Sequence, residues 1–89
     1  MSQWSLHTST DFDKTARKID RAVLRRVFAY LDEVCILDDP RSRGKALTAN
    51  MAGFWRYRVG DYRVIVEIQD ARLVIVAVAL GHRSVVYEP

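Results

Sequence analysis

Hydrophobic residues in the first half of the chain recur at intervals of three and four, which is the repeat of an α-helix. The stretch TDFDKTARKI opens with cap-type residues, Thr10 or Asp11, and then places Phe12, Ala16 and Ile19 at helical spacing. This pattern predicts a first, short helix that buries one side.

A second helix is expected to begin after Asp20, a plausible N-cap, and to end near Leu37, before the sequence DDP. Its apolar positions form a single stripe: Val23, Leu24, Val27, Phe28, Leu31 and Val34. Pro40 makes further helix unfavourable. The pattern is typical of an amphipathic helix packed on a core.

The second half of the chain follows the two-residue repeat of β-strands. Three strands are expected, at residues 54–59, 62–68 and 73–80. Gly60 and Asp61 form a tight hairpin turn between the first two, and the third, LVIVAVAL, is apolar on both faces, as in a central strand. Residues 4–9 alternate weakly and predict a short edge strand, and Tyr87 lies in a final extended piece.

Residues 38–53, between the helices and these strands, are basic, rich in Gly, Ser, Asn and Pro, and without a clear period, so we expect a loop. The order strand–helix–helix–strand–strand–strand indicates an α+β fold. Two helices would pack on one face of a mostly antiparallel, twisted sheet of about four strands. Residues 1–89 would form one domain, with the other sheet face partly open.

Composition places the chain among small folded domains. It has 89 residues, of which 49% are hydrophobic and 28% charged. No apolar run reaches the roughly 18–20 residues of a membrane span, and the polar, acidic first 13 residues do not resemble a signal peptide. The single cysteine, Cys35, cannot form an internal disulfide and fits a buried helical position, so a cytoplasmic protein is expected.

Positive charge is concentrated in the second half of the chain. Residues 1–40 carry six basic and seven acidic residues, whereas residues 41–89 carry eight basic and four acidic ones. Eleven of the fourteen basic residues are arginine, whose planar fork of donors suits phosphate. The second half therefore fits a polyanionic partner, although an ordinary soluble surface would also carry such charge.

Strand alternation sorts the sequence FWRYRVGDYRVIVEI into two faces. Trp55, Tyr57, Val59, Tyr62, Val64, Val66 and Ile68 are expected to build the core face. Arg56, Arg58 and Arg63 would share the opposite face, with Arg83 close to it. Neutralisation by Glu67, Asp61 and solvent is one interpretation of this cluster, and a phosphate-binding surface is the other.

Other residues offer weaker signals. Arg41, Arg43 and Lys45 in the loop are candidate RNA contacts, and His82 is a candidate for RNA binding or proton transfer, although a turn residue that positions Arg83 explains it better. The helix arginines Arg17, Arg21, Arg25 and Arg26 fit RNA contact and a solvated helix face equally well. Two histidines and one cysteine are too scattered in sequence for a metal site, so none is expected.

The hairpin WRYRVGDYR followed by LGHRSVVYE resembles the RelE/ParE superfamily of bacterial toxins from type II toxin–antitoxin systems, and the likeness covers almost the whole chain. For the RelE branch, the resemblance implies a microbial-ribonuclease-like fold and a metal-independent, cofactor-free endoribonuclease. Such an enzyme cuts messenger RNA in the ribosomal A site by attack of the ribose 2′-hydroxyl on the adjacent phosphate. It also implies inhibition by a RelB-like antitoxin, in a hetero-oligomeric complex that binds DNA through the antitoxin.

The catalytic positions of that branch fall on Arg56, Arg58, Arg63, Arg83 and Tyr87 of this sequence. Well-studied RelE enzymes have lysine at the positions of Arg56 and Arg58, and arginine is a poor general base. The proton from the 2′-hydroxyl would then pass to Tyr87, His82 or a ribosomal group. The alternative function is that of a ParE-like toxin, which inhibits DNA gyrase without being an enzyme, and a silent module that binds only its antitoxin is a third possibility.

Overall fold

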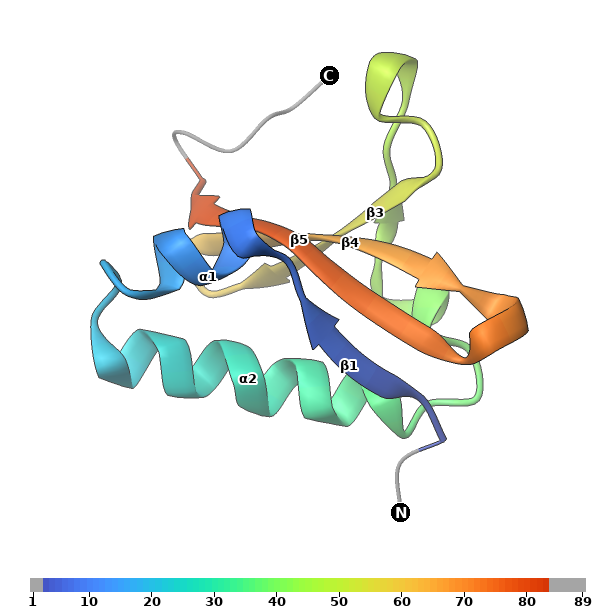
Figure 1. Ribbon diagram of the computed structural model, residues 1–89, viewed down its shortest axis with the longest axis horizontal. Coiled ribbons are helices and arrows are strands. Elements are labelled where there is room, and N and C mark those ends of the chain that lie inside the picture. Colours follow the sequence, from blue (N-terminus) through green and yellow to red (C-terminus); the bar gives the residue numbers. More distant parts are fainter. Residues whose placement is uncertain (1–2, 84–89) are drawn as a thin grey trace.

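The computed structural model describes residues 3–83, which form two helices packed on one side of a five-stranded sheet (Figure 1). The helices are α1 (Thr10–Ala16) and α2 (Arg21–Cys35). The strands are β1 (Ser5–Thr8), β2 (Lys45–Ala46), β3 (Phe54–Val59), β4 (Tyr62–Gln69) and β5 (Val74–His82). Three short 3₁₀ turns lie at Pro40–Arg43, Ala49–Met51 and Asp70–Arg72. The expected α+β architecture is thus confirmed.

Side-chain caps fix where both helices begin. Ser9, one residue before the predicted cap, accepts a hydrogen bond from the Phe12 amide (3.1 Å) and donates one to the Val78 carbonyl (2.9 Å). Asp20 caps α2 as predicted, accepting from the Ala22 amide at 3.0 Å. Helix α2 ends at Cys35, slightly before the predicted Leu37.

The strand order is β1-β5-β4-β3-β2, with β1 parallel to β5 and all other neighbours antiparallel. The prediction of about four strands omitted β2, because two residues are too short to show a period. The edge position of β1 and the interior position of β5 are as expected. The segment between β2 and β3 projects beyond the sheet, away from α2 (Figure 1).

A β-bulge lies where β4 pairs with β5. Ile65 pairs with Ala79 and Val66 with Ala77, which leaves Val78 as an extra residue in β5. Before the bulge, Ile75 and Ala77 belong to the core; after it, Leu80 does. The bulge therefore reverses which residues of β5 face the helices, and it leaves Gly81 opposite Arg63.

The core lies between the helices and one face of the sheet. Phe12 of α1 and Val27 and Val34 of α2 meet Tyr57 and Val66, all at 0% exposure. Trp55, Tyr62 and Ile68 are partly buried against the same cluster. The predicted core face of the hairpin is confirmed.

Two further expectations from the sequence concern the burial of Cys35 and the length of the helices. Cys35 is buried, at 3% exposure, and burial raises the pKa of its thiol, as suits a packing residue rather than a nucleophile. Within residues 3–83, neither helix is long and apolar enough to cross a membrane.

Candidate phosphate-binding face

Three of the predicted arginines lie together on the side of the sheet that faces away from the helices. Arg56 and Arg58 come from β3, and Arg63 comes from β4, directly opposite Arg58 in the register. Cross-strand partners have Cβ atoms about 4.5–5.5 Å apart and point to the same side. We call Arg56, Arg58 and Arg63 the arginine face.

Burial differs within the arginine face. Arg56 is only 9% exposed and lies opposite the fully buried Ile65, whereas Arg63 is half-buried and Arg58 exposed. Arg56 is thus a deeply seated guanidinium with its neighbours packed around it, although the sequence predicted an open face. A fixed cation of this kind suits the binding of an anion without reorganisation.

Like charges placed directly opposite each other on a sheet destabilise it. Arg58 and Arg63 are such a pair, next to the Gly60-Asp61 turn. Glu67 shares this side of the sheet but lies opposite Phe54, at the other end of β3, and accepts a hydrogen bond from the Gln69 amide group (2.6 Å). An anionic ligand at the turn end of the hairpin would relieve the repulsion.

Arg83, which follows β5, is brought to the same end of the hairpin. Its backbone amide donates a 2.8 Å hydrogen bond to the Asp61 carbonyl in the turn. Beside it, Gly81 offers no side chain opposite Arg63. The structure therefore brings Arg58, Arg63 and the backbone of Arg83 to one turn, with Arg56 two residues along β3. Tyr87, the fifth predicted catalytic residue, lies outside the described residues.

The loop arginines Arg41 and Arg43 form ion pairs with carboxylates of the same chain. Arg41 makes a bidentate ion pair with Asp70 (3.0 and 2.6 Å), with its guanidinium 5.8 Å from the centre of the Trp55 ring. The hydrogen bonds from Arg41 hold the pKa of Asp70 below its usual value. Arg43 pairs with Glu33 (3.4 Å). Arg41 and Arg43, two of the four predicted RNA contacts, thus have ion-pair partners within the protein.

His82 lies away from the arginine face. It pairs with Tyr62 across β4 and β5, and the two rings meet edge to face, 5.5 Å apart. Tyr62 packs on the helix side of the sheet. His82 is therefore the last residue of β5 and not the predicted turn residue that positions Arg83. It lies on the helix side because the bulge reverses the alternation of β5.

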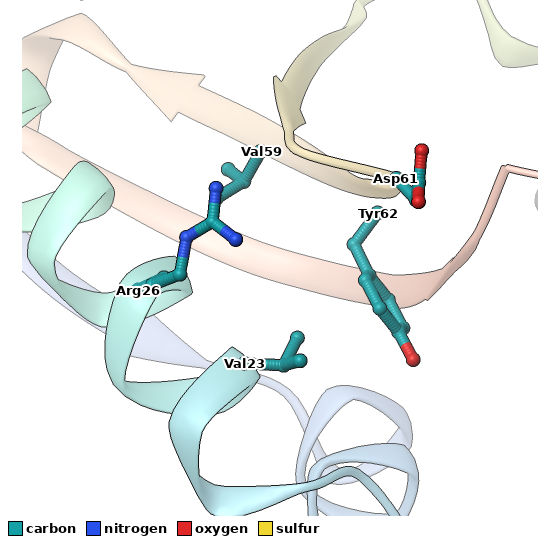
Figure 2. A pocket seen from close by; sticks show the side chains of 5 residues that line it. All are labelled: Val23, Arg26, Val59, Asp61 and Tyr62. Atoms are coloured by element: carbon teal, nitrogen blue, oxygen red, sulfur yellow. The ribbon is translucent and has the colours of Figure 1, made fainter.

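A hollow lies on the helix side of the same turn, lined by Val23, Arg26, Val59, Asp61 and Tyr62. Figure 2 shows Arg26 extending from α2 toward Val59, and Tyr62 directed from the hairpin toward the helices. Arg26 also covers Gly60, which has φ +59°; a Cβ atom there would lie 3.3 Å from the guanidinium. This contact, which the sequence pattern does not reveal, ties α2 to the turn between β3 and β4, the two strands of the arginine face.

The predicted loop contact Lys45 is placed differently from Arg41 and Arg43. It lies in β2, directly opposite Arg56, and is exposed. The sequence pattern does not reveal this pairing, because a strand of two residues is too short to show a period. Among residues 3–83, His, Cys, Asp and Glu side chains form no group of three or more that could hold a metal ion.

Together, these observations define a RelE-like toxin fold with basic side chains gathered on the sheet face opposite the helices. A family model described as the ParE toxin of type II toxin–antitoxin systems, parDE, matches residues 3–87. The chain belongs to this family, within the RelE/ParE superfamily, and is the toxin of a type II toxin–antitoxin system.

Individual relatives agree with this assignment. Toxin RelG of Mycobacterium tuberculosis is 30% identical over 79 residues, covering 85% of this chain and 91% of RelG. The toxin–antitoxin complex RelBE2 of the same organism superposes with a TM-score of 0.74 at 25% identity, over 94% of this chain and 95% of the other. A mutant of the Escherichia coli toxin RelE in the free state superposes with a TM-score of 0.73 at 20% identity. The superposition covers 92% of this chain and 84% of that RelE chain.

Proposed function

We propose that this toxin is a ribosome-dependent endoribonuclease that cuts messenger RNA in the A site and so inhibits translation. The observation that carries the proposal is the placement of Arg58 opposite Arg63 at the turn end of the β3–β4 hairpin, with the backbone of Arg83 bonded to the turn and Arg56 two residues along β3 on the same side. The similarity to Toxin RelG and to RelE structures supports the same class of activity.

In the proposed reaction, the ribose 2′-hydroxyl attacks the adjacent phosphorus and the bond to the 5′ oxygen breaks, leaving a cyclic phosphate. Negative charge builds up on the phosphorus oxygens in the transition state. Guanidinium groups that are already in place stabilise that charge, and removing one such donor typically costs about 10²–10³ in rate. Arg58, Arg63 and Arg83 would contact the phosphate, with Arg56 beneath them and Tyr87 completing the set.

The reaction as proposed uses no metal and no cofactor. The protein would act in the cytoplasm and be held inactive by a RelB-like antitoxin, in a hetero-oligomeric complex that binds DNA through the antitoxin. The solved complexes of RelE-type toxins with their antitoxins, among them RelBE2 and a RelE–RelB complex from Pyrococcus horikoshii, support such a partner.

A ParE-like inhibitor of DNA gyrase is the second candidate, favoured by the description of the matching family model. The two candidates share a fold, so the choice depends on the side chains. The arginine face favours the nuclease, because an inhibitor that cuts no phosphodiester has no need of opposed guanidinium groups.

Expression of the chain in cells, with mapping of transcript 5′ ends, tests the proposal. We expect breaks within translated codons that disappear in Arg83→Ala and Tyr87→Ala variants. Arg72→Ala, an exposed arginine in the β4–β5 turn that donates to Gln69, is the matched control and should cut normally. Intact transcripts together with blocked gyrase supercoiling would overturn the nuclease and establish the second candidate.

A further inference from the structure

Lys45 occupies a position next to the arginine face. Its register partner is Arg56, while its neighbour Ala46 pairs with Trp55 on the helix side. Arg58 lies two residues along β3 from Arg56, on the same side, so it is the diagonal neighbour of Lys45. Lys45, which is exposed, thus lies on the same side of the sheet as the three arginines.

Several contacts hold this short strand in place. The Tyr57 hydroxyl donates a buried 2.6 Å hydrogen bond to the Pro40 carbonyl, and burial raises the pKa of Tyr57 well above its usual value, so the hydroxyl keeps its proton. Gly44 fits closely against Tyr57: a Cβ atom there would lie 3.0 Å from the ring. After the strand, the Leu47 amide donates to the Phe54 carbonyl (3.0 Å). Lys45 is therefore anchored from both sides.

An amine differs chemically from a guanidinium. The reaction proposed above must remove one proton from the 2′-hydroxyl and supply one to the 5′ oxygen. Arginine binds phosphate well but keeps its proton at any pH a protein experiences, whereas a lysine ammonium can give its proton away. Of the three lysines, Lys14 and Lys18 lie in or just after α1, on the helix side; Lys45 is the one beside the arginines.

We propose that Lys45 is a catalytic residue that donates a proton to the leaving 5′ oxygen. The inference rests on the proposed nuclease function. As the 2′ oxygen forms its bond to phosphorus, the bond from phosphorus to the 5′ oxygen breaks, and its electron pair goes to that oxygen. Lys45 protonates the oxygen, a basic group of the ribosome accepts the proton of the 2′-hydroxyl, and the neutral amine then recovers a proton from water.

The test compares two messengers on programmed ribosomes, one with the natural 5′ oxygen at the cut site and one with sulfur in its place. A thiolate leaves without being protonated, so it needs no proton donor. With oxygen, Lys45→Ala and Lys45→Arg should cut about 10²–10⁴-fold more slowly than the wild type. With sulfur, both variants should cut nearly as fast as the wild type.

Controls separate this inference from the proposed function. Lys18→Ala should match the wild type on both messengers, and Arg63→Ala should be slow on both, because phosphate stabilisation is needed in either case. Lys45→Arg retains the positive charge and provides the same comparison of the two messengers if Lys45→Ala does not fold. Equal slowing on both messengers, or none, overturns the role of Lys45 while leaving the nuclease intact. A wild-type toxin that cuts neither messenger overturns the nuclease itself.

Discussion

The helix side and the far side of the β3–β4 hairpin are built from alternate residues of the same strands, yet their environments differ. On the helix side, Tyr57 and Val66 are completely buried among apolar neighbours. On the far side, Arg58 is exposed and directly opposite Arg63. One side gains free energy from burial, whereas the other places two positive charges in register, an arrangement that folding alone does not require. The comparison assigns stability to the helix side and agrees with the ligand binding that we propose for the far side.

The most direct test of this difference between the faces is to truncate adjacent residues that lie on opposite sides of β3. Tyr57→Ala should lower the free energy of unfolding by about 3–5 kcal/mol, as truncation of a buried aromatic side chain does. Arg58→Ala, one residue away, should change it by less than about 0.5 kcal/mol. Urea unfolding measures both values. Similar losses in the two variants would mean that the faces do not differ as described.

A smaller substitution at Tyr57 tests the hydrogen bond that holds Pro40 and the loop around it. Tyr57→Phe keeps the ring but leaves the buried Pro40 carbonyl without its 2.6 Å donor, which should cost about 1–2 kcal/mol. Tyr30→Phe is the control, since the Tyr30 hydroxyl makes no hydrogen bond to any other residue in the described part of the chain. If both substitutions cost the same, the bond to Pro40 is not what holds the loop.

The far face allows a stabilising substitution. Arg58→Gln removes one of two directly opposed positive charges, and we expect a gain of about 0.2–0.5 kcal/mol in the free energy of unfolding. The gain should shrink as salt is added, since salt screens exposed charges. RNA cleavage should fall at the same time. A loss of stability at low salt would show that Arg58 contributes to folding and would contradict the comparison.

The smallest expected effect concerns Arg41, whose ion pair with Asp70 is exposed. Because Arg41 lowers the pKa of Asp70 in the folded protein, the pair stabilises the fold above the usual Asp pKa of about 4 and stops doing so as pH falls through the lower folded value. The small stability difference between wild type and Asp70→Asn should therefore be constant near neutral pH and vanish in acid. A difference that grows in acid would contradict this sign.

Alternation and local signals predicted much of the fold. β3 was predicted to the residue, because six alternating positions end at an unambiguous Gly60-Asp61 turn. Three features depended on contacts that a local pattern cannot contain. Arg41 and Asp70 are 29 positions apart in the sequence. The two residues of β2 form a strand only by pairing with β3. The bulge at Ile65 and Val66 determines the side of the sheet on which His82 lies.

The candidate site was assembled from sequence only in part. Alternation correctly placed Arg56, Arg58 and Arg63 on one side, because each strand of the hairpin is regular over that stretch. It gave no indication that Arg56 is nearly buried, since burial depends on neighbouring strands. It also gave no reason to set Lys45 apart from Arg41 and Arg43, because all three are basic residues of one irregular segment.

The central claim is that the arginine face performs the chemistry while the helix face maintains the fold. Cleavage of a messenger on programmed ribosomes, measured for Arg58→Ala and Arg63→Ala beside Arg72→Ala, tests it most directly when each variant's free energy of unfolding is also determined. We predict a loss of at least about 100-fold in the first two variants, with folding retained, and full activity in the third. Undiminished cleavage by the two face variants, or losses that simply follow stability, would contradict the claim.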